Sequence, residues 1–279
     1  MVIYGLDFTS SPRPGKPLYC IECRLRGETL ELKRVHRLPT LSAFEKSLRV
    51  SGPWIAGFDF PFGQPRKLIE NLGWPTCWDG YVHRIGSMTR PEWRKVLGAY
   101  CSARPQRDKY HPRATDVPAG AACAMNPVRP PVALMFYEGA PRLLRAGLSV
   151  LPCRPSESDR IAIEAYPALV ARRWVGRVSY KQDQRSKQSS DQAATRRTIV
   201  NGLSSGECER AYGFRVAMLP GMAESLVEDG TADRLDSLLC AVQAAWAYTR
   251  RDCGWGIPRD ADSLEGWIAD PSLERTPLE

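Results

Sequence analysis

The sequence predicts an α/β fold: a mixed five-stranded sheet, made of a three-strand meander and further parallel strands, flanked by helices. Residues 2–8 form a nearly continuous apolar run, which is typical of a central strand covered on both faces. Two segments of alternating pattern, 19–25 and 30–33, predict an antiparallel hairpin that turns at 26–28. A helical pattern and a second apolar run ending at Asp59 follow, and this β-β-β-α-β order makes the last strand parallel to the first.

The helix before the Asp59 strand is predicted from its first turn and its apolar stripe. Ser42 and Glu45 have the spacing of a capping box, in which each side chain bonds a free backbone N–H at the helix start. Apolar residues recur at helical intervals at Leu41, Phe44 and Leu48. The helix is then expected to end at Gly52-Pro53.

After the Asp59 strand, one long segment lacks the periodicity of a helix or strand, and regular patterns return beyond it. Residues 61–134 lack sustained periodicity and are rich in Pro, Arg, Trp and Tyr, so we expect an irregular, functional insertion with one short helix at 92–101. Later patterns predict a polar loop at 179–190, a strand that ends at Glu164, and helices at 139–147, 168–174, 191–203 and 231–248. No internal repeat or linker divides the sequence, so we expect a single domain over residues 1–279.

Charge is concentrated in two parts of this moderately basic chain, whose net charge is +8. Residues 84–113 and residues 172–197 each contain 8 Lys and Arg against 2 acidic residues, so the remainder is net negative. Such basic segments favour a polyanionic partner, nucleic acid above all, although solvated surface segments have the same composition. Both interpretations fit the sequence.

The cellular environment is predicted to be the reducing cytoplasm. The start of the chain lacks a basic region before an apolar one, and no stretch approaches the roughly 18 apolar residues of a membrane span. Nine cysteines form no disulfide framework, and Cys20 and Cys23 are expected on opposite faces of a strand. A zinc site is disfavoured because its candidates have no standard spacing: Cys77, His83, Cys101 and His111.

Acidic residues follow three of the predicted strands and begin the last helix. Asp7, Asp59 and Glu164 each end an apolar run, where an uncompensated charge is costly. Asp233 and Asp236 are three residues apart on the last helix and therefore share a face. Because open α/β sheets gather their chemistry at the carboxyl edge, we expect these five side chains to converge as candidate catalytic residues.

Each carboxylate also has a structural interpretation. Asp7 has the sequence context of a turn closed by Thr9 and Ser10, and Glu164 has arginines nearby to pair with. Asp233 stands at a helix N-terminus, where the helix dipole favours an acid in any case. Asp236 lies beside Leu239, at the edge of the apolar stripe that this helix is expected to bury, so its position is harder to explain without a function.

A metal ion is the usual compensation for crowded carboxylates. Two Mg²⁺ or Mn²⁺ ions, roughly 3.5–4 Å apart, activate a water and neutralise a leaving oxygen in phosphodiester hydrolysis. We expect the metal ligands to be Asp7, Asp59 and Asp236. Candidate contacts to substrate phosphates are Thr9, Ser10, Lys181 and Arg185.

Short motifs in the same order along the chain resemble the uncharacterised "domain of unknown function" family of predicted RNase H-like nucleases. The motifs are Gly5-Leu6-Asp7, residues 57–61, residues 163–167, Tyr180-Lys181, residues 233–238 and residues 265–268. The resemblance covers nearly the whole chain and implies an RNase H-like fold and a nuclease activity. The metal-site candidates that it implies are Asp7, Asp59, Glu164, Asp233 and Asp236.

Two other function classes remain open. The segment 5–11 is partly like the first phosphate loop of actin/hexokinase-like phosphotransferases, although Phe8 and Ser10 stand where glycines are expected. A non-catalytic nucleic-acid-binding protein on the same fold would explain the basic segments but would not need the five acids. Metal-dependent cleavage, stabilisation by ATP and salt-sensitive binding without cleavage distinguish the three.

Overall fold

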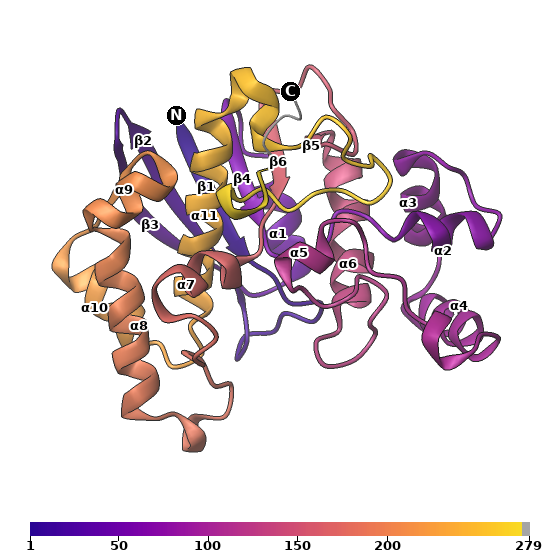
Figure 1. Cartoon of the computed structure of the whole chain (residues 1–279), viewed down its shortest axis with the longest axis horizontal. Helices are drawn as coiled ribbons and strands as arrows, with labels where there is room; N and C mark the ends of the chain where they lie inside the picture. Colours follow the sequence, from indigo (N-terminus) through magenta and orange to yellow (C-terminus); the bar gives the residue numbers. More distant parts are fainter. Residues whose placement is uncertain (275–279) are drawn as a thin grey trace.

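One mixed seven-stranded sheet organises the computed structural model, which describes residues 1–274 (Figure 1). The strand order is β5-β6-β4-β1-β2-β3-β7. The strands are β1 (Val2–Asp7), β2 (Leu18–Arg26), β3 (Thr29–Leu38), β4 (Trp54–Phe58), β5 (Ser149–Leu151), β6 (Arg160–Glu164) and β7 (Arg215–Ala217). The meander and the parallel strands are confirmed. The prediction of five strands was wrong, because β5 and β7 extend the edges with three residues each, too few to show a period.

Parallel pairing brings the ends of the acidic strands together. β1 pairs antiparallel with β2 and parallel with β4, and β4 pairs parallel with β6. The register aligns Gly5 with Gly57 and Phe58 with Glu164. The strand before Asp7 therefore neighbours the strand before Asp59, as predicted, and their carboxyl ends lie at the same edge of the sheet.

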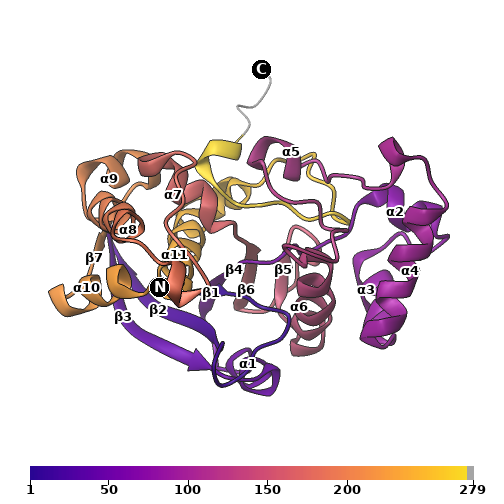
Figure 2. The same cartoon turned by 90° about the horizontal axis from the view of Figure 1, so that it is seen from below.

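Helices cover both faces of the sheet (Figure 2). They are α1 (Leu41–Ser47), α2 (Arg66–Asn71), α3 (Trp78–Gly86), α4 (Arg90–Ser102), α5 (Asp116–Ala119), α6 (Val132–Ala146), α7 (Pro167–Val175), α8 (Ser190–Leu203), α9 (Gly206–Tyr212), α10 (Pro220–Glu228) and α11 (Asp233–Thr249). One core layer joins the sheet to α7–α11, and the other joins it to α1–α4 and α6. Cys20 and Cys23 lie in different layers, as expected for opposite strand faces.

The irregular insertion was the main error of the sequence prediction. Residues 61–134 contain α2, α3, α4, α5 and the start of α6, and only the helix predicted at 92–101 is confirmed, as α4. These helices are short and separated by Pro and Gly, so no long window has a clear period. Burial nevertheless holds these helices in place. Tyr81 and Trp93, for example, are fully buried in the core layer that joins the sheet to α1–α4 and α6.

Two helix starts also differ from the prediction. The cap of α1 is Thr40, whose hydroxyl accepts from the Ala43 N–H at 3.1 Å, and not Ser42. Helix α6 begins at Val132 rather than near Gly139, and Pro141 lies in its interior. Its end at Gly147 is as predicted, because the backbone there has a φ of 68°, which glycine adopts without strain.

Candidate functional site

Two glycines allow α11 to lie directly on β1 and β4. A Cβ added to Gly5 would lie 2.0 Å from the Ser237 carbonyl oxygen, and one added to Gly57 would lie 2.3 Å from that of Cys240. Because side chains two apart on a strand share a face, Asp7 and Asp59 face the same helix as these glycines. The Gly-x-Asp spacing in both strands thus brings two carboxylates against the first turns of α11.

The N-terminus of α11 is anchored by groups before and within its first turn. Asp229 accepts from the Arg234 backbone N–H at 3.2 Å, and it precedes Ala232, which has a left-handed φ of 61°. The Ser237 hydroxyl accepts from the Asp7 N–H at 3.2 Å and lies 2.9 Å from the Tyr19 carbonyl oxygen. Ser237 therefore ties the helix to the end of β1 and the start of β2. Sequence reasoning missed both anchoring roles.

Asp7, Asp59 and Asp236 lie close enough at this edge for the charges of Asp236 and Asp59 to act on Asp7. Asp7 and Asp59 share a side-chain hydrogen bond. Asp236 is 1% exposed, and both of its oxygens are engaged. Its Oδ1 accepts from the Tyr180 hydroxyl at 2.6 Å, and its Oδ2 accepts from the Lys181 ammonium at 2.5 Å. We call Asp7, Asp59, Asp236 and Lys181 the carboxylate cluster.

Burial and mutual repulsion raise the pKa of carboxyl groups in this region. The pKa of Asp7 lies well above its ordinary value because of burial, then the charges of Asp236 and Asp59. Burial also raises the pKa of Asp59 to about 7, although the Lys181 ammonium opposes the shift. Asp233 lies near the cluster, and burial followed by the charge of Asp229 raises its pKa to about 6. Two adjacent carboxyls that share a proton are the expected result of such crowding.

The segment that carries Lys181 is fixed by polar contacts to its backbone. Arg196 of α8 is 3% exposed and donates to the carbonyl oxygens of Tyr180 and Val227, each at 2.7 Å. The Gln182 N–H donates to the Gly230 carbonyl oxygen at 3.0 Å. The backbone around Lys181 is consequently held in position, and its ammonium is bonded by Asp236.

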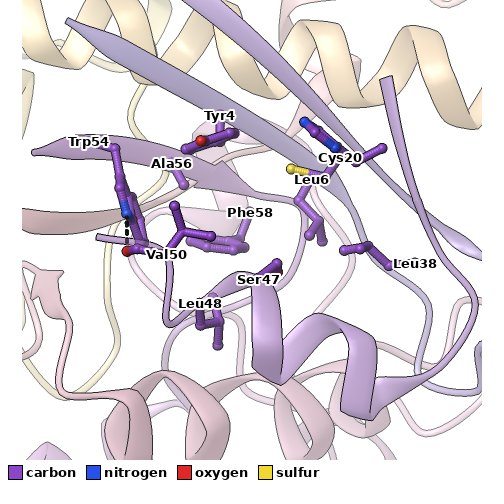
Figure 3. Close-up of a pocket in the computed structure, with 11 residues that line it drawn as sticks. Tyr4, Leu6, Cys20, Leu38, Ser47, Leu48, Val50, Trp54, Ala56 and Phe58 are labelled. Atoms are coloured by element: carbon purple, nitrogen blue, oxygen red, sulfur yellow. Dashed lines mark hydrogen bonds between the residues drawn. The ribbon is translucent and has the colours of Figure 1, made fainter. Parts of the chain in front are cut away.

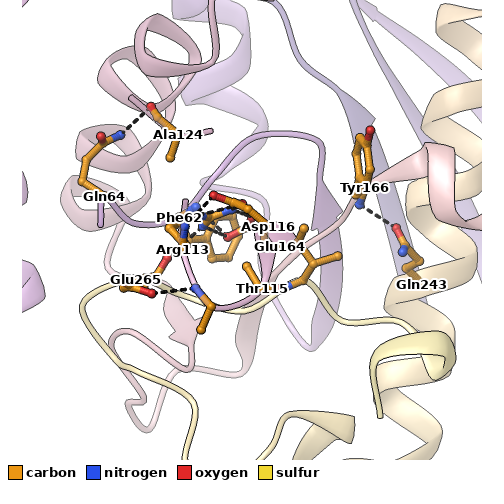
Figure 4. A network of polar contacts seen from close by, with 12 residues as sticks. Phe62, Gln64, Arg113, Thr115, Asp116, Ala124, Glu164, Tyr166, Gln243 and Glu265 are labelled. Carbon is orange, nitrogen blue, oxygen red and sulfur yellow. Dashed lines mark hydrogen bonds and ion pairs between the residues drawn. The ribbon is translucent and has the colours of Figure 1, made fainter. Parts of the chain in front are cut away.

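Glu164 belongs to a second cluster, formed with Arg113 and Asp116 (Figure 4). Arg113 donates to its two oxygens at 2.6 and 2.8 Å, and the Phe62 N–H adds a bond of 2.8 Å. Both Asp116 oxygens also accept bonds from Arg113. The pairing of Glu164 with an arginine, the structural alternative, is therefore present. By holding Phe62, Glu164 fixes the loop that begins at Asp59.

The predicted substrate contacts differ in their access to solvent. Thr9 is half-buried, and Arg185 lies exposed in a short 3-10 helix, η2 (Arg185–Lys187). Ser10 is 3% exposed, and its hydroxyl accepts from Arg90 of α4 at 3.0 Å. Arg90 also donates to the Ser10 carbonyl oxygen, so α4 holds the loop that follows Asp7. This link between the insertion and the site has no signal in the sequence.

The two basic segments occupy different parts of the molecule. The α4 portion of residues 84–113 lies toward one end of the long axis, and α8 lies toward the other (Figure 1). Arg113 and Arg196 are buried in polar networks, so they are not available to phosphates. The exposed cations of residues 172–197 include Arg177, Arg185 and Lys187, in and near the segment that carries Lys181.

The fit of a divalent ion to these residues is partial. Within residues 1–274, no group of three or more His, Cys, Asp or Glu side chains is arranged to hold a metal ion, and this includes the four zinc candidates. Lys181 and Tyr180 occupy both oxygens of Asp236. The Asp7–Asp59 pair is crowded, acidic and short of cations, so the chemistry of its donors suits a hard divalent ion.

An apolar pocket lies on the other face of the sheet (Figure 3). Its volume is about 120 Å³, and its lining includes Tyr4 and Leu6 of β1 and Phe58 of β4. These positions alternate with Gly5, Asp7 and Asp59, so the sheet separates the pocket from the carboxylate cluster.

Comparison of the chain with protein-family models, curated proteins and solved structures finds no match. None of the helices in the described part of the chain combines the length and apolar character needed to cross a membrane.

Proposed function

We propose that this protein is a divalent-metal-dependent hydrolase of nucleic acid phosphodiesters, built on an RNase H-like core. The observation that carries the proposal is the meeting of Asp7, Asp59 and Asp236 from β1, β4 and α11 around one ammonium group. The series β3-β2-β1-β4-β6, a meander continued by parallel strands, supports the fold assignment. It agrees with the resemblance to the family of predicted RNase H-like nucleases.

Charge balance supports a divalent ion in particular. Three ionised carboxylates and one ammonium leave the cluster with a net charge of about −2, which is costly in a buried setting. Asp59 would instead keep a proton near neutral pH, since burial raises its pKa to about 7. A hard cation with oxygen ligands relieves the same repulsion and releases that proton.

Different residues would bind the metal ion, provide a fixed positive charge, hold the substrate and position the loop. Asp7 and Asp59 would hold the ion, and Mg²⁺ or Mn²⁺ would make a bound water more acidic and neutralise charge on the phosphate. Lys181 provides a fixed positive charge beside them, and exposed cations such as Arg177 and Arg185 would hold the backbone phosphates of the substrate. Glu164 positions the Asp59 loop through Phe62.

The test uses the purified chain, labelled single-stranded, duplex, hybrid and branched oligonucleotides, and Mn²⁺ or Mg²⁺. We expect metal-dependent cleavage that Asp7→Asn abolishes, since the substitution keeps the shape and removes a metal-binding charge. Asp252→Asn is the matched control, because that side chain is 81% exposed and follows the C-terminal end of α11, whereas Asp236 lies in the first turn of that helix.

The outcomes separate the function classes. Cleavage that persists in Asp7→Asn would indicate a contaminant. Stabilisation by ATP without cleavage would favour the phosphotransferase, and salt-sensitive binding without cleavage would favour a nucleic-acid-binding protein. The proposal would be refuted if the protein showed no cleavage, no metal-dependent stabilisation and no binding of oligonucleotides.

A further inference from the structure

Lys181 stands inside the carboxylate cluster rather than at its rim. Its ammonium lies 2.5 Å from Asp236 Oδ2 and acts on the charges of Asp7 and Asp59 as well. The other oxygen of Asp236 is taken by the Tyr180 hydroxyl. A metal ion that used Asp236 would therefore have to share an oxygen with an ammonium group, against the repulsion of like charges.

The position of this ammonium is determined by contacts behind it. Arg196, Gln192 and Gly230 bond the backbone of residues 180–182 on the side of α8 and α10. The Lys181 side chain is 49% exposed although its ammonium is bonded to the buried Asp236, so its stem borders the solvent from which a substrate would arrive. These contacts describe a fixed point charge at the edge of the solvent.

We infer that Lys181 is the second cation of the site, so that the carboxylate cluster binds one divalent ion and not two. The inference rests on the proposed function and changes its two-ion form. One divalent ion balances the roughly −2 charge of three carboxylates and one ammonium, whereas a second ion would over-compensate it.

This assignment gives Lys181 a direct contact with the substrate. A compact ammonium is suited to pair with a non-bridging phosphate oxygen, and its half-exposed stem allows that contact while Asp236 holds the other side. Each such phosphate contact contributes about one counterion to the salt dependence of binding. Lys181 then orients the phosphate beside the ion held by Asp7 and Asp59.

The experiment measures Mn²⁺ stoichiometry by titration calorimetry and equilibrium dialysis, without substrate. We expect one ion per chain in the wild type and in the control Lys187→Met, which removes an exposed lysine from the same loop. In Lys181→Met the freed Asp236 carboxylate should admit a second ion, and Lys181→Arg, which keeps the charge, should restore a stoichiometry of one.

Two ions in the wild type would overturn the inference and leave the proposed function standing, whereas no bound ion would overturn both. One ion in a folded Lys181→Met protein would show that Lys181 does not exclude the second ion. If Lys181→Met does not fold, the wild-type stoichiometry alone decides. Oligonucleotide binding in Ca²⁺ adds a further readout: Lys181→Arg should keep the salt slope, and Lys181→Met should lower it by about 1. An unchanged slope in Lys181→Met would refute the phosphate contact.

Discussion

Two groups of charges lie at the carboxyl edge of the same sheet, one buried and one partly buried, and they are built in opposite ways. Around Glu164, one arginine donates to every oxygen of two carboxylates, and a backbone N–H adds a further bond. In the carboxylate cluster, one lysine faces three carboxyls, two of which contact each other. In the first group, side chains and backbone of the protein satisfy every carboxylate oxygen. In the second group, the carboxyls outnumber the positive charges.

The difference separates a structural role from a functional one. A buried ionic group stabilises a protein only when its hydrogen bonds are satisfied, as those of Glu164 are. A cluster left with excess like charge costs stability, and such a cost is typical of sites that bind a ligand. Both groups come from acids at the ends of apolar strands, so their sequence signals are alike.

The largest expected effect is the loss of the paired cluster. Arg113→Ala leaves Glu164 and Asp116 buried without their partner, which should lower the free energy of unfolding by roughly 3–5 kcal/mol. Urea denaturation measures it, with the exposed Arg107→Ala as control. Equal stability of the two variants would contradict the structural role of this cluster.

Removing one donor from the carboxylate cluster should have a smaller effect. Tyr180→Phe deletes the hydroxyl that donates to Asp236 Oδ1, and a hydrogen bond to a charged group contributes roughly 1.5–3 kcal/mol. We expect a loss toward the lower end in urea denaturation, because Lys181 still pairs with Asp236. If Tyr180→Phe lowered the free energy of unfolding as much as Arg113→Ala, the two clusters would contribute equally to stability, and the contrast between them would be wrong.

The contact between α11 and the sheet offers a test of how the cluster is positioned. Gly57→Ala places a Cβ 2.3 Å from the Cys240 carbonyl oxygen, so the helix must shift, at a cost of roughly 1–3 kcal/mol. The control is Gly15→Ala, where nothing lies within 4 Å of the added Cβ. Mn²⁺ stabilisation should weaken in Gly57→Ala alone, as a thermal melt with and without metal would show.

The last test concerns the pH dependence of stability in the absence of metal. The folded-state pKa of Asp59, about 7, exceeds its unfolded value of about 3.9, so its contribution to stability is full below pH 4 and is lost as pH rises to 7. Asp59→Asn should therefore show a smaller loss of Tm between pH 4 and pH 7 in EDTA than the wild type. Asp252→Asn should retain the wild-type slope. A wild-type Tm that rises over this interval would contradict the crowding of Asp7 and Asp59.

The local pattern of the chain was enough to predict the central strands and the longest helices. Apolar runs and alternation located β1–β4 and β6, and the stripe of Leu235, Leu238 and Leu239 located α11, because each signal lies within a few neighbouring residues. The same strand ends predicted the convergence of Asp7 and Asp59. The helices of residues 61–134 escaped prediction, since they are short and depend on burial of side chains such as Trp93.

The sequence by itself determined which acids would gather at the carboxyl edge, because strand order and side-chain alternation follow from patterns along the chain. Only the tertiary structure decided which of those acids are balanced. Arg113 reaches Glu164 from 51 residues away, and Lys181 reaches Asp236 across 55 residues. Pairing of buried charges depends on such distant contacts, and no local pattern encodes them.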